Sequence, residues 1–410
     1  MSAMPLSGIR VLDLTSVVVG PACTVRLANY GADVVKVESF EGDQMRVLGG
    51  PSPTGEHSGS YLHFNGGKRS ICLNLKQPAA RKIVSRLLDV ADVFVSNMRP
   101  DALARLGLDA DRLRDEHPRL VHCTITGFGP GGPYRGRAAY DSALQGASGI
   151  AGLFNRRDGH PKYVPLLICD HVVGEIAAGA ILSALFDRER TGRGTKLEIP
   201  MYETMAAFVL QQHLGPKTFE PALGAVGDSR VLNPDNRPLQ TADGWISLTA
   251  NTDAQTRAFL EAIGREDAID DPRFRTTADR YRHVGEWFAL RNDALKARKT
   301  AEWLELFAAY DVPAMPCHTL ETLLDDPHLT AVGILGDMVH PTEGRIRGIR
   351  PTILNDDAVA PVGRAAGPIG WDTRSVLSEL GFSAGDIQEF RKAGVARVYE
   401  PAGGAAGMVS

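Results

Sequence analysis

Short apolar runs alternate with longer amphipathic runs up to about residue 200 of this chain. The short runs are rich in Val, Ile and Leu and do not alternate cleanly with polar residues, which is typical of strands buried on both faces of a parallel sheet. We predict strands at residues 10–14, 33–38, 70–73, 92–96, 120–125 and 196–199. Helical patterns fall between them, at residues 22–30, 78–88, 110–116 and 172–187. This alternation predicts an open, Rossmann-like α/β sheet.

A second pattern begins after the polar, Pro- and Gly-spaced stretch at residues 214–238. We predict a strand at 245–250, helices at 253–263, 284–297 and 300–310, and a final helix at 384–393. The domain division follows from these shifts in pattern. It consists of a large Rossmann-like domain at 1–205, a linker at 206–226, a smaller α/β domain at 227–326, a return linker with the C-terminal part of the large domain at 327–400, and a flexible tail at 401–410.

Composition, net charge and the spacing of cysteines and histidines exclude several classes of protein. The chain has 410 residues, 43% of them hydrophobic, and a net charge of −4 that is spread along the sequence, so we expect neither a nucleic-acid nor a membrane partner. The apolar run 176–186 is too short to span a bilayer, and no basic leader precedes the turn at Gly20-Pro21, so we expect a cytoplasmic protein. Five scattered cysteines without a CxxC pair, and histidines without an HxxxH or HxH pair, predict no disulfide framework and no metal site.

Residues 127–132 fit the GxGxxG pattern of dinucleotide-binding sites and follow a predicted strand. Such a site needs a helix that begins at once, and an acidic residue about twenty positions later. Pro130 and Pro133 prevent an immediate helix, and the acidic residue is missing. We therefore interpret the segment as a turn-rich loop and expect no nicotinamide or flavin.

Asp170 stands where an apolar run ends and a long apolar helix begins. This position predicts the N-cap of that helix, and capping alone is one interpretation. The same place also suits a carboxylate nucleophile, because a helix N-terminus favours the ionised form and its N–H groups can bind an oxyanion. Cys169 and His171 offer a rival thiol–imidazole pair. They would have to turn toward one another across Asp170, so we interpret Cys169 as a small buried residue and His171 as a residue of the first helical turn.

Basic side chains recur near the ends of the predicted strands. Solvated surface is the ordinary explanation, but open α/β sheets bind ligands at this edge and a polyanionic nucleotide needs cations there. The basic residues are Arg46, Lys68, Arg69, Lys76, Arg99, Arg105 and Arg137.

A series of motifs in sequence order carries a resemblance to a known family. They span about residues 6–390 and are Gly8–Thr15 with Gly20-Pro21, Gly31–Glu38, Gly42-Asp43 with Arg46, Asn65–Ser70, Leu73–Lys76, Asp92–Asn97 with Arg99-Pro100, Leu106-Gly107, Gly127–Tyr134, Tyr140-Asp141, Arg188–Gly194 and Asp325–Leu329. With these motifs the chain resembles the family III CoA-transferases (CaiB/BaiF family), which include formyl-CoA and carnitine CoA-transferases.

The resemblance implies a function and a set of site residues. Asp170 falls on the catalytic aspartate of the family. The implied substrates are an acyl-CoA and a free carboxylic acid, with coenzyme A as substrate and no permanently bound cofactor. The implied assembly is an interlocked homodimer of ring-shaped subunits. The implied CoA contacts are Val18, Val19, Leu73, Asn74, Leu75, Lys76, Asn97, Met98, Arg99, Arg105, Ala138, Ala139, Tyr140 and Asp141.

The expected reaction is transfer of CoA from an acyl-CoA, with succinyl-CoA as one candidate, through an aspartyl anhydride and an aspartyl-CoA thioester. Ser39 stands where formyl-CoA transferase has a basic contact, and the glycine-rich loop over the oxalate site of that enzyme has no counterpart between Leu232 and Gly244. Oxalate specificity is therefore not expected.

Two alternatives remain open at this point. The first is an α-methylacyl-CoA racemase, whose histidine base is replaced here by Tyr140, a poor base at neutral pH. The more remote alternative is a non-catalytic acyl-CoA binding protein. The acceptor acid cannot be read from the chain. Candidates for contact with its carboxylate are Arg137, His171, Arg230 and Asn236.

Overall fold

The computed structural model describes residues 4–356 and 358–401, so the predicted tail lies outside the described residues from 402 onward. The chain forms two compact units. The first comprises the described residues of Met1–Ser148, Val164–Ala207 and Leu329–Ser410, and the second comprises Gly149–Tyr163 and Phe208–His328. The second unit thus contains the predicted small domain at 227–326, most of the predicted linker before it, and a short segment that the sequence analysis placed in the large domain.

The first unit is built on a seven-stranded sheet with the order β14-β3-β2-β1-β4-β5-β6. Strands β1 to β6 run parallel, and β14 pairs antiparallel with β3 at one edge. The order reverses between β1 and β4, and in open α/β sheets ligands bind beyond the carboxyl ends of the strands at such a point. The strands are β1 Arg10–Leu14, β2 Asp33–Glu38, β3 Arg69–Leu73, β4 Val93–Ser96, β5 Val121–Thr126, β6 Lys196–Pro200 and β14 Ala396–Arg397.

The mixed α/β class and the parallel sheet confirm the prediction made from the alternating pattern. All six parallel strands lie within one residue of their predicted ends. Strand β14, only two residues long, carries too little pattern to be found in the sequence.

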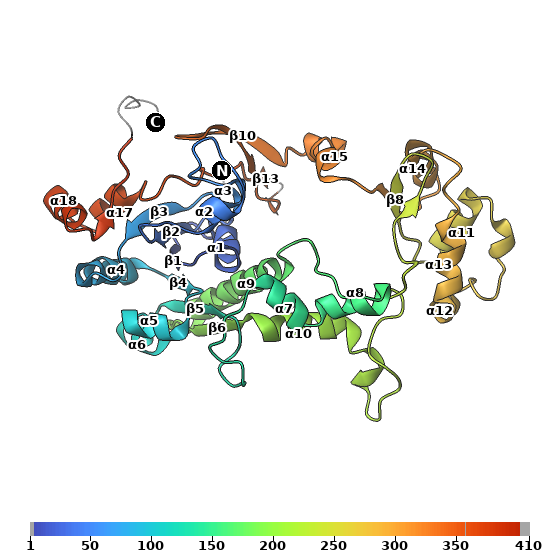
Figure 1. The fold of residues 1–410 in the computed structure, drawn as a ribbon, viewed down its shortest axis with the longest axis horizontal. Helices are drawn as coiled ribbons and strands as arrows, with labels where there is room; N and C mark the ends of the chain where they lie inside the picture. Colours follow the sequence, from blue (N-terminus) through green and yellow to red (C-terminus); the bar gives the residue numbers. More distant parts are fainter. Residues whose placement is uncertain (1–3, 357, 402–410) are drawn as a thin grey trace. The chain divides into compact units, whose positions relative to one another are not determined.

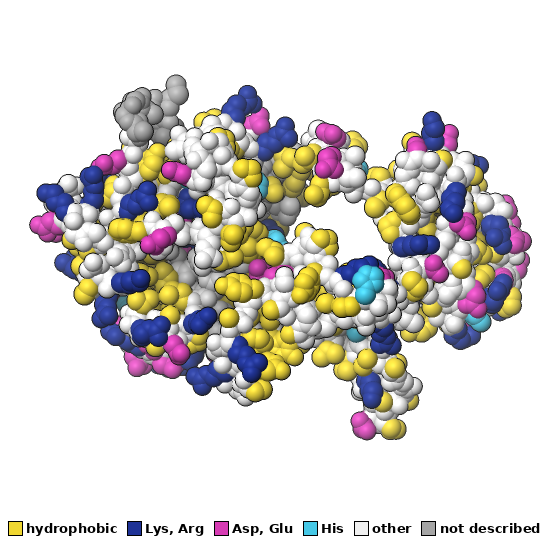
Figure 2. Space-filling view, viewed as in Figure 1, with side chains coloured by type: hydrophobic (Ala, Val, Ile, Leu, Met, Phe, Trp, Pro, Cys, Tyr) yellow, Lys and Arg dark blue, Asp and Glu magenta, His cyan; other side chains and the backbone are white. Residues whose placement is uncertain are grey.

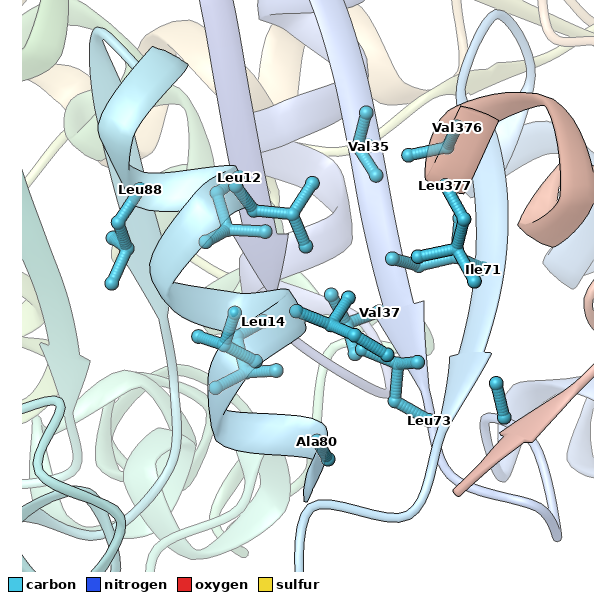
Figure 3. Close-up of a cluster of buried hydrophobic side chains, with 14 of the residues drawn as sticks. Leu12, Leu14, Val35, Val37, Ile71, Leu73, Ala80, Leu88, Val376 and Leu377 are labelled. Atoms are coloured by element: carbon cyan, nitrogen blue, oxygen red, sulfur yellow. The ribbon is translucent and has the colours of Figure 1, made fainter. Parts of the chain in front are cut away.

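Helices cover both faces of this sheet (Figure 1). On one face, helix α1 (Val19–Asn29) packs against α9 (Ile168–Thr191). On the other face, Leu12, Leu14 and the inward side chains of β2 and β3 pack against a second set of helices, as Figure 3 shows. That set is α4 (Pro78–Val90), α5 (Pro100–Leu106), α6 (Ala110–Glu116), α17 (Thr373–Glu379) and α18 (Ala384–Lys392).

Helix α9 differs from its prediction at both ends. It has 24 residues and begins at Ile168, four residues before the predicted start. By length and composition the whole helix is long and apolar enough to cross a membrane, which the run 176–186 by itself is not. Half of its most apolar 18-residue window is buried inside the protein. A Cβ on Gly174 would lie 2.9 Å from both Val19 O and Ala22 Cβ, so the glycine lets α9 pack directly against the start of α1.

The rest of the first unit consists of short helices, a hairpin and a second pair of antiparallel strands, β12 (Leu354–Asn355) and β13 (Ala358–Val359). Antiparallel strands β10 (Leu335–His340) and β11 (Gly344–Ile349) form the hairpin. His57, before α3, contacts it through Glu343, with 2.7 Å between His57 Nδ1 and the carboxylate. The short helices are α2 (Met45–Leu48), α3 (Gly59–Asn65), α7 (Asp141–Ala147) and the first half of α10 (Met201–His213).

The second unit has its own core, in which Phe259, Trp287, Trp303 and Phe307 are buried. A three-stranded antiparallel sheet, β7-β8-β9, packs with the helices that the sequence predicted there. Its elements are α8 (Ile150–Asp158), β7 (Leu239–Gln240), β8 (Trp245–Leu248), α11 (Asp253–Ala262), α12 (Thr277–Arg282), α13 (Val284–Asn292), α14 (Thr300–Ala309), β9 (Ala314–Pro316) and α15 (Leu320–Leu324), with α16 (Pro327–Ala331) at the boundary. On the face drawn in Figure 2, basic and acidic side chains intermingle over the described surface.

Candidate active site

A cleft of about 1280 Å³ lies within the first unit, at the carboxyl ends of β1 to β5. Its wall includes Leu14, Leu73 and Thr126, each at the end of a strand, and Asp170. Its volume exceeds the roughly 300–1,000 Å³ of ordinary small-ligand pockets. The cleft therefore has room for a long ligand, and it lies where the reversal of strand order predicts one.

The structure brings nearly all the predicted CoA contacts to this cleft. Of the predicted residues, Asp141 alone does not line it, and it is 4% exposed. The lining residues from that set are Val18, Val19, Leu73, Asn74, Leu75, Lys76, Asn97, Met98, Arg99, Arg105, Ala138, Ala139 and Tyr140.

Several basic side chains in the wall of the cleft form no salt bridge, although Lys196 pairs with Asp111. Within the described part of the chain, no salt bridge ties up Lys76, Arg99, Arg105, Arg135 or Arg137. Unpaired, exposed cations beside a cleft attract phosphate groups, for which Arg offers paired N–H donors. Not every cation of the predicted series belongs to this group, because Arg46, Lys68 and Arg69 form ion pairs with Glu38, Asp13 and Asp33.

Two hydrogen bonds brace the loops after β1 and β4 against each other. The Ser16 N–H donates to Asn97 Oδ1 at 3.0 Å, and Asn97 Nδ2 donates to Ser16 O at 2.9 Å. Val17, next in the chain, has φ +68, a rare conformation for a β-branched residue. The N–H of Val17 donates to Asp43 Oδ1 at 3.0 Å, so a buried carboxylate holds this strained turn beside the cleft.

Asp170 is a first-turn residue of α9 and not its N-cap, so that prediction was wrong. The helix begins at Ile168, and Leu167 occupies the N-cap position without a side-chain acceptor. Asp141 fills that role from α7. Its Oδ1 accepts the N–H of Cys169 at 2.8 Å and that of Asp170 at 3.3 Å. Because another residue caps the helix, no hydrogen bond of the cap occupies the carboxylate of Asp170.

Burial raises the pKa of Asp170 to about 7, and the nearby charge of Asp141 adds to that effect. We had expected the helix N-terminus to favour the ionised form, but Asp141 places a negative charge against the same N–H groups. Asp170 is 9% exposed. It is therefore a shielded carboxylate with unusual basicity, as is common for acids, bases and nucleophiles in active sites.

Cys169 is buried, as expected from the sequence. Burial raises the pKa of its thiol to about 12, with Asp141 and Asp170 adding to the effect. Since only the thiolate is strongly nucleophilic, the structure disfavours the thiol–imidazole alternative. His171 is exposed and contacts Phe64 in a tilted arrangement, with 5.4 Å between ring centroids.

Beneath the loop after β1 lies a set of buried charges, which we call the ion-pair network: Asp13, Lys36, Glu38, Asp43, Arg46 and Lys68. Lys68 Nζ lies 3.2 Å from Asp13, Lys36 Nζ lies 2.9 Å from Asp43, and Arg46 lies 2.7 Å from Glu38. Burial alone would raise the pKa of Glu38, but Arg46 and Lys36 outweigh it and lower the value to about 2. Each carboxylate of the network therefore has a cation beside it.

The GxGxxG segment is a loop, as predicted, and the next helix, α7, begins only at Asp141. Gly129 N–H donates to Glu203 at 2.8 Å, and Phe128 packs against Tyr134 and Tyr202. We had expected that N–H groups at the start of α9 can bind an oxyanion. The Gly129 N–H is taken, and those of Cys169, Asp170 and His171 already bind Asp141 or Leu167 O. The start of α9 is thus not a free oxyanion site.

The remaining predicted residues lie in different places. Arg137 lines the cleft with its guanidinium 4.6 Å above the ring of Tyr134. His171 is absent from the cleft wall. Arg230 and Asn236 belong to the second unit, where Arg230 pairs with Asp228 at 2.7 Å and Asn236 Nδ2 donates to Arg230 O. Their role toward an acceptor acid stays a prediction.

Sequence reasoning missed the capping role of Asp141 and the part played by Gln145. Gln145 Nε2 donates to Asp141 Oδ2 at 2.7 Å, one helical turn away. A carboxylate followed four residues later by an amide, on a short helix before the candidate nucleophile, is the one signal that the chain offers. Metal ligands are not grouped in the described residues, where no cluster of three His, Cys, Asp or Glu side chains could hold an ion.

The fold and the cleft define an α/β protein with a large cleft, whose wall carries cations without salt bridges in the described chain and a carboxylate of raised pKa. Comparison with known proteins gives the family. The sequence model of CoA-transferase family III matches residues 6–373, so the chain belongs to the family III CoA-transferases.

Similar proteins agree with this assignment. A succinate–glutarate CoA-transferase of Agrobacterium fabrum is 34% identical over 92% of this chain and 96% of its own length. The human succinyl-CoA:glutarate CoA-transferase is 29% identical over 97% of this chain and 91% of its own. A CaiB/BaiF family protein from Brucella suis has a crystal structure that matches 92% of this chain and 100% of its own, with a TM-score of 0.77 and 30% identity.

Proposed function

We propose that the protein transfers CoA from an acyl-CoA to a free carboxylic acid, with Asp170 as the covalent nucleophile. The observation that carries the proposal is Asp170 itself. It is a shielded carboxylate in the wall of a cleft, with its pKa raised to about 7 by burial and by Asp141. A more basic carboxylate is a better nucleophile toward a thioester carbonyl, and shielding protects acyl intermediates from water.

The reaction consists of four displacements at carbonyl carbon. Asp170 attacks the donor thioester and expels CoA thiolate, giving a mixed anhydride. The thiolate attacks the Asp170 carbonyl, which releases the donor carboxylate and leaves an aspartyl-CoA thioester. The acceptor carboxylate attacks that thioester and expels the thiolate again. The thiolate then attacks the acceptor acyl carbon, forming the new acyl-CoA and restoring Asp170 without net proton transfer.

The cations of the cleft fit the other part of the substrate. Lys76, Arg99 and Arg105 have no salt bridge within the described chain and would meet the phosphates of CoA. This arrangement leaves the thioester end of the ligand for the part of the cleft beside Asp170. A bound CoA would therefore lie along the carboxyl edge of the sheet.

Dicarboxylic acids are the proposed substrates, with succinyl-CoA as donor and a short dicarboxylate such as glutarate as acceptor. Two of the similar proteins carry these substrates in their names. The second carboxylate of such a substrate, which is not bonded to CoA, needs a cation. We propose Arg137 for this contact, because it lines the cleft and has no salt bridge in the described chain. The interlocked homodimer and the cytoplasmic location stay predictions.

The test incubates the purified protein with succinyl-CoA and, separately, with acetate, oxalate, glutarate or adipate, and follows the new thioesters by liquid chromatography with mass detection. We expect glutaryl-CoA, with a rate that falls by at least about 10³-fold in Asp170→Ala, because the covalent route is lost. Asp187→Ala, on the exposed side of the same helix, is the matched control and should keep the wild-type rate.

Each alternative gives a different result in the same experiment. A racemase would exchange the α-proton of a 2-methylacyl-CoA for deuterium without any free acid, although its base position holds Tyr140, which is 71% exposed. A binding protein would do neither. Transfer that persists at the wild-type rate in Asp170→Ala would refute the assignment of the nucleophile.

A further inference from the structure

Two side chains on helix α7 hold the segment that leads into Asp170. Asp141 Oδ1 accepts the N–H groups of Cys169 and Asp170 at 2.8 and 3.3 Å. Gln145 Nε2 donates to Asp141 Oδ2 at 2.7 Å and to Leu166 O at 3.1 Å. The Val164 N–H donates to Gln145 Oε1 at 2.8 Å. Asp141 and Gln145 therefore fix the chain at the residues just before, and at, the candidate nucleophile.

Both side chains are buried and committed to these contacts. Asp141 is 4% exposed and Gln145 is 1% exposed. A buried amide that makes four hydrogen bonds has little freedom to change its partners. Gln145 precedes and Val164 follows the segment Gly149–Tyr163, which belongs to the second unit. The hydrogen bonds between them therefore hold the chain where it re-enters the first unit.

The pair of carboxylates has no cation of its own. Within the described residues, neither Asp141 nor Asp170 forms a salt bridge, in contrast to the carboxylates of the ion-pair network. Two carboxylates that lie close together in a buried site raise the energy of the doubly ionised state. The nearby charge of Asp141 accordingly contributes to the raised pKa of Asp170, after burial.

We propose that Asp141 is a positioning residue that fixes the backbone of Asp170 and, through its negative charge, makes the Asp170 carboxylate more basic. Gln145 completes the device by holding Asp141 and the chain at Val164–Leu166. The inference rests on the proposed function, since it gives Asp141 a role toward the nucleophile named there. The side chain of Asp141 thus acts in two ways, as a hydrogen-bond acceptor for the backbone and as a negative charge near Asp170.

Asp141→Asn removes the charge, while its amide oxygen can still accept both N–H groups. Its Nδ2 then faces the donor Gln145 Nε2, so the hydrogen bond to Gln145 is also lost. Gln145→Met, which loses that bond but keeps the charge of Asp141, is therefore titrated beside it. The first readout needs no activity. Protein labelled with ¹³C at the aspartate carboxyl groups is titrated by NMR, and the Asp170 signal is assigned by its loss in Asp170→Asn. We expect the midpoint of Asp170 to fall by roughly one pH unit in Asp141→Asn, as expected when a neighbouring like charge is removed. Asp386→Asn is the matched control, because Asp386 also accepts a backbone N–H, that of Ser383 at 2.8 Å, but lies on α18.

The second readout is the pH profile of transfer. In the wild type the rate should rise with pH through the titration of Asp170, and in Asp141→Asn this acid limb should move to lower pH by the same amount. A folded Asp141→Asn whose Asp170 midpoint and acid limb both match the wild type would overturn the proposal. If the wild type shows no transfer, the proposed function fails, and the NMR titration still decides the inference about Asp141.

Gln145→Met provides a variant that keeps the charge of Asp141, for use if Asp141→Asn does not fold. It removes the hydrogen bonds to Asp141, Val164 and Leu166 at similar volume. We expect kcat to fall about tenfold while KM for the acyl-CoA changes less than about threefold, because the nucleophile is displaced and the CoA contacts are kept. Unchanged kcat in folded Gln145→Met would overturn the positioning role.

Discussion

The ion-pair network and the Asp141–Asp170 pair are both sets of buried carboxylates in the first unit, and they differ in their compensation. In the network, Asp13, Glu38 and Asp43 each have a Lys or Arg within 3.2 Å. At the start of α9, the carboxylate of Asp141 accepts the N–H groups of Cys169 and Asp170, and neither Asp141 nor Asp170 has a salt bridge in the described chain. The pKa of Glu38 is lowered to about 2, whereas that of Asp170 is raised to about 7. A buried carboxylate with a cation beside it stays ionised and stabilises the fold. A buried carboxylate without a cation becomes more basic, as is common for reactive groups in active sites.

The largest effect is expected where a compensated pair is broken. Asp13→Asn removes the charge that faces Lys68 in a fully buried place. Leaving a buried cation without its partner costs about 3–5 kcal/mol, so the free energy of unfolding from urea titration should fall by that amount. Asp33→Asn, which breaks a partly exposed pair with Arg69, is the control and should cost about 0–1 kcal/mol. Equal effects of the two variants would contradict the account of the network.

The next effect concerns acid stability. The pKa of Glu38 is lowered from 4.5 to about 2, so its ionised form stabilises the folded state above pH 4.5, and this stabilisation is lost as the pH falls toward 2. Its size is about 3 kcal/mol. Glu38→Gln should lower the free energy of unfolding at neutral pH and flatten its dependence between about pH 5 and 3. If the free energy of unfolding of the variant kept the wild-type dependence on pH, groups other than Glu38 would cause the loss of stability in acid.

Asp170 should show the opposite sign. Its pKa is raised from 3.8 to about 7, so the folded state holds the proton more tightly, and stability is lost as the pH rises between these two values. Asp170→Asn removes this penalty and should gain on the order of 2 kcal/mol at about pH 8 while losing transfer. The gain should shrink near pH 4 in parallel urea titrations. A variant that is less stable than the wild type at both pH values would show that Asp170 is compensated after all.

The smallest effect is expected when a cation of the cleft wall that forms no salt bridge in the described chain is removed. Arg99→Ala should raise KM for the acyl-CoA about fivefold, roughly 1 kcal/mol, since one exposed contact to a phosphate is lost. The effect should weaken at higher salt. Arg119→Ala, an exposed arginine outside the wall of the cleft, should leave KM unchanged. The same increase in both variants would indicate a general effect of surface charge.

The sequence predicted the sheet well because its parallel strands are short runs rich in Val, Ile and Leu, a signal that lies within each strand. Residues 10–14 and 33–38 match β1 and β2 at both ends. The start of α9 was misplaced because its cap comes from Asp141, 28 residues before Cys169, and local pattern cannot show a partner at that distance. Asp170 was chosen as a candidate in spite of that error, and it lines the cleft. The same lack of long-range information hid the Asp13–Lys68 pair, so Lys68 was grouped with the basic residues near the strand ends.

The central claim, that Asp170 becomes covalently acylated, is tested most directly by trapping the intermediate. The protein is mixed with succinyl-CoA in the absence of an acceptor and quenched with hydroxylamine, which attacks the aspartyl carbonyl of the thioester and releases CoA. Peptide mass spectrometry should then find a hydroxamate at Asp170 that needs succinyl-CoA and is missing in Asp170→Asn. Active protein that carries the adduct on another residue, or none at all, would contradict the account.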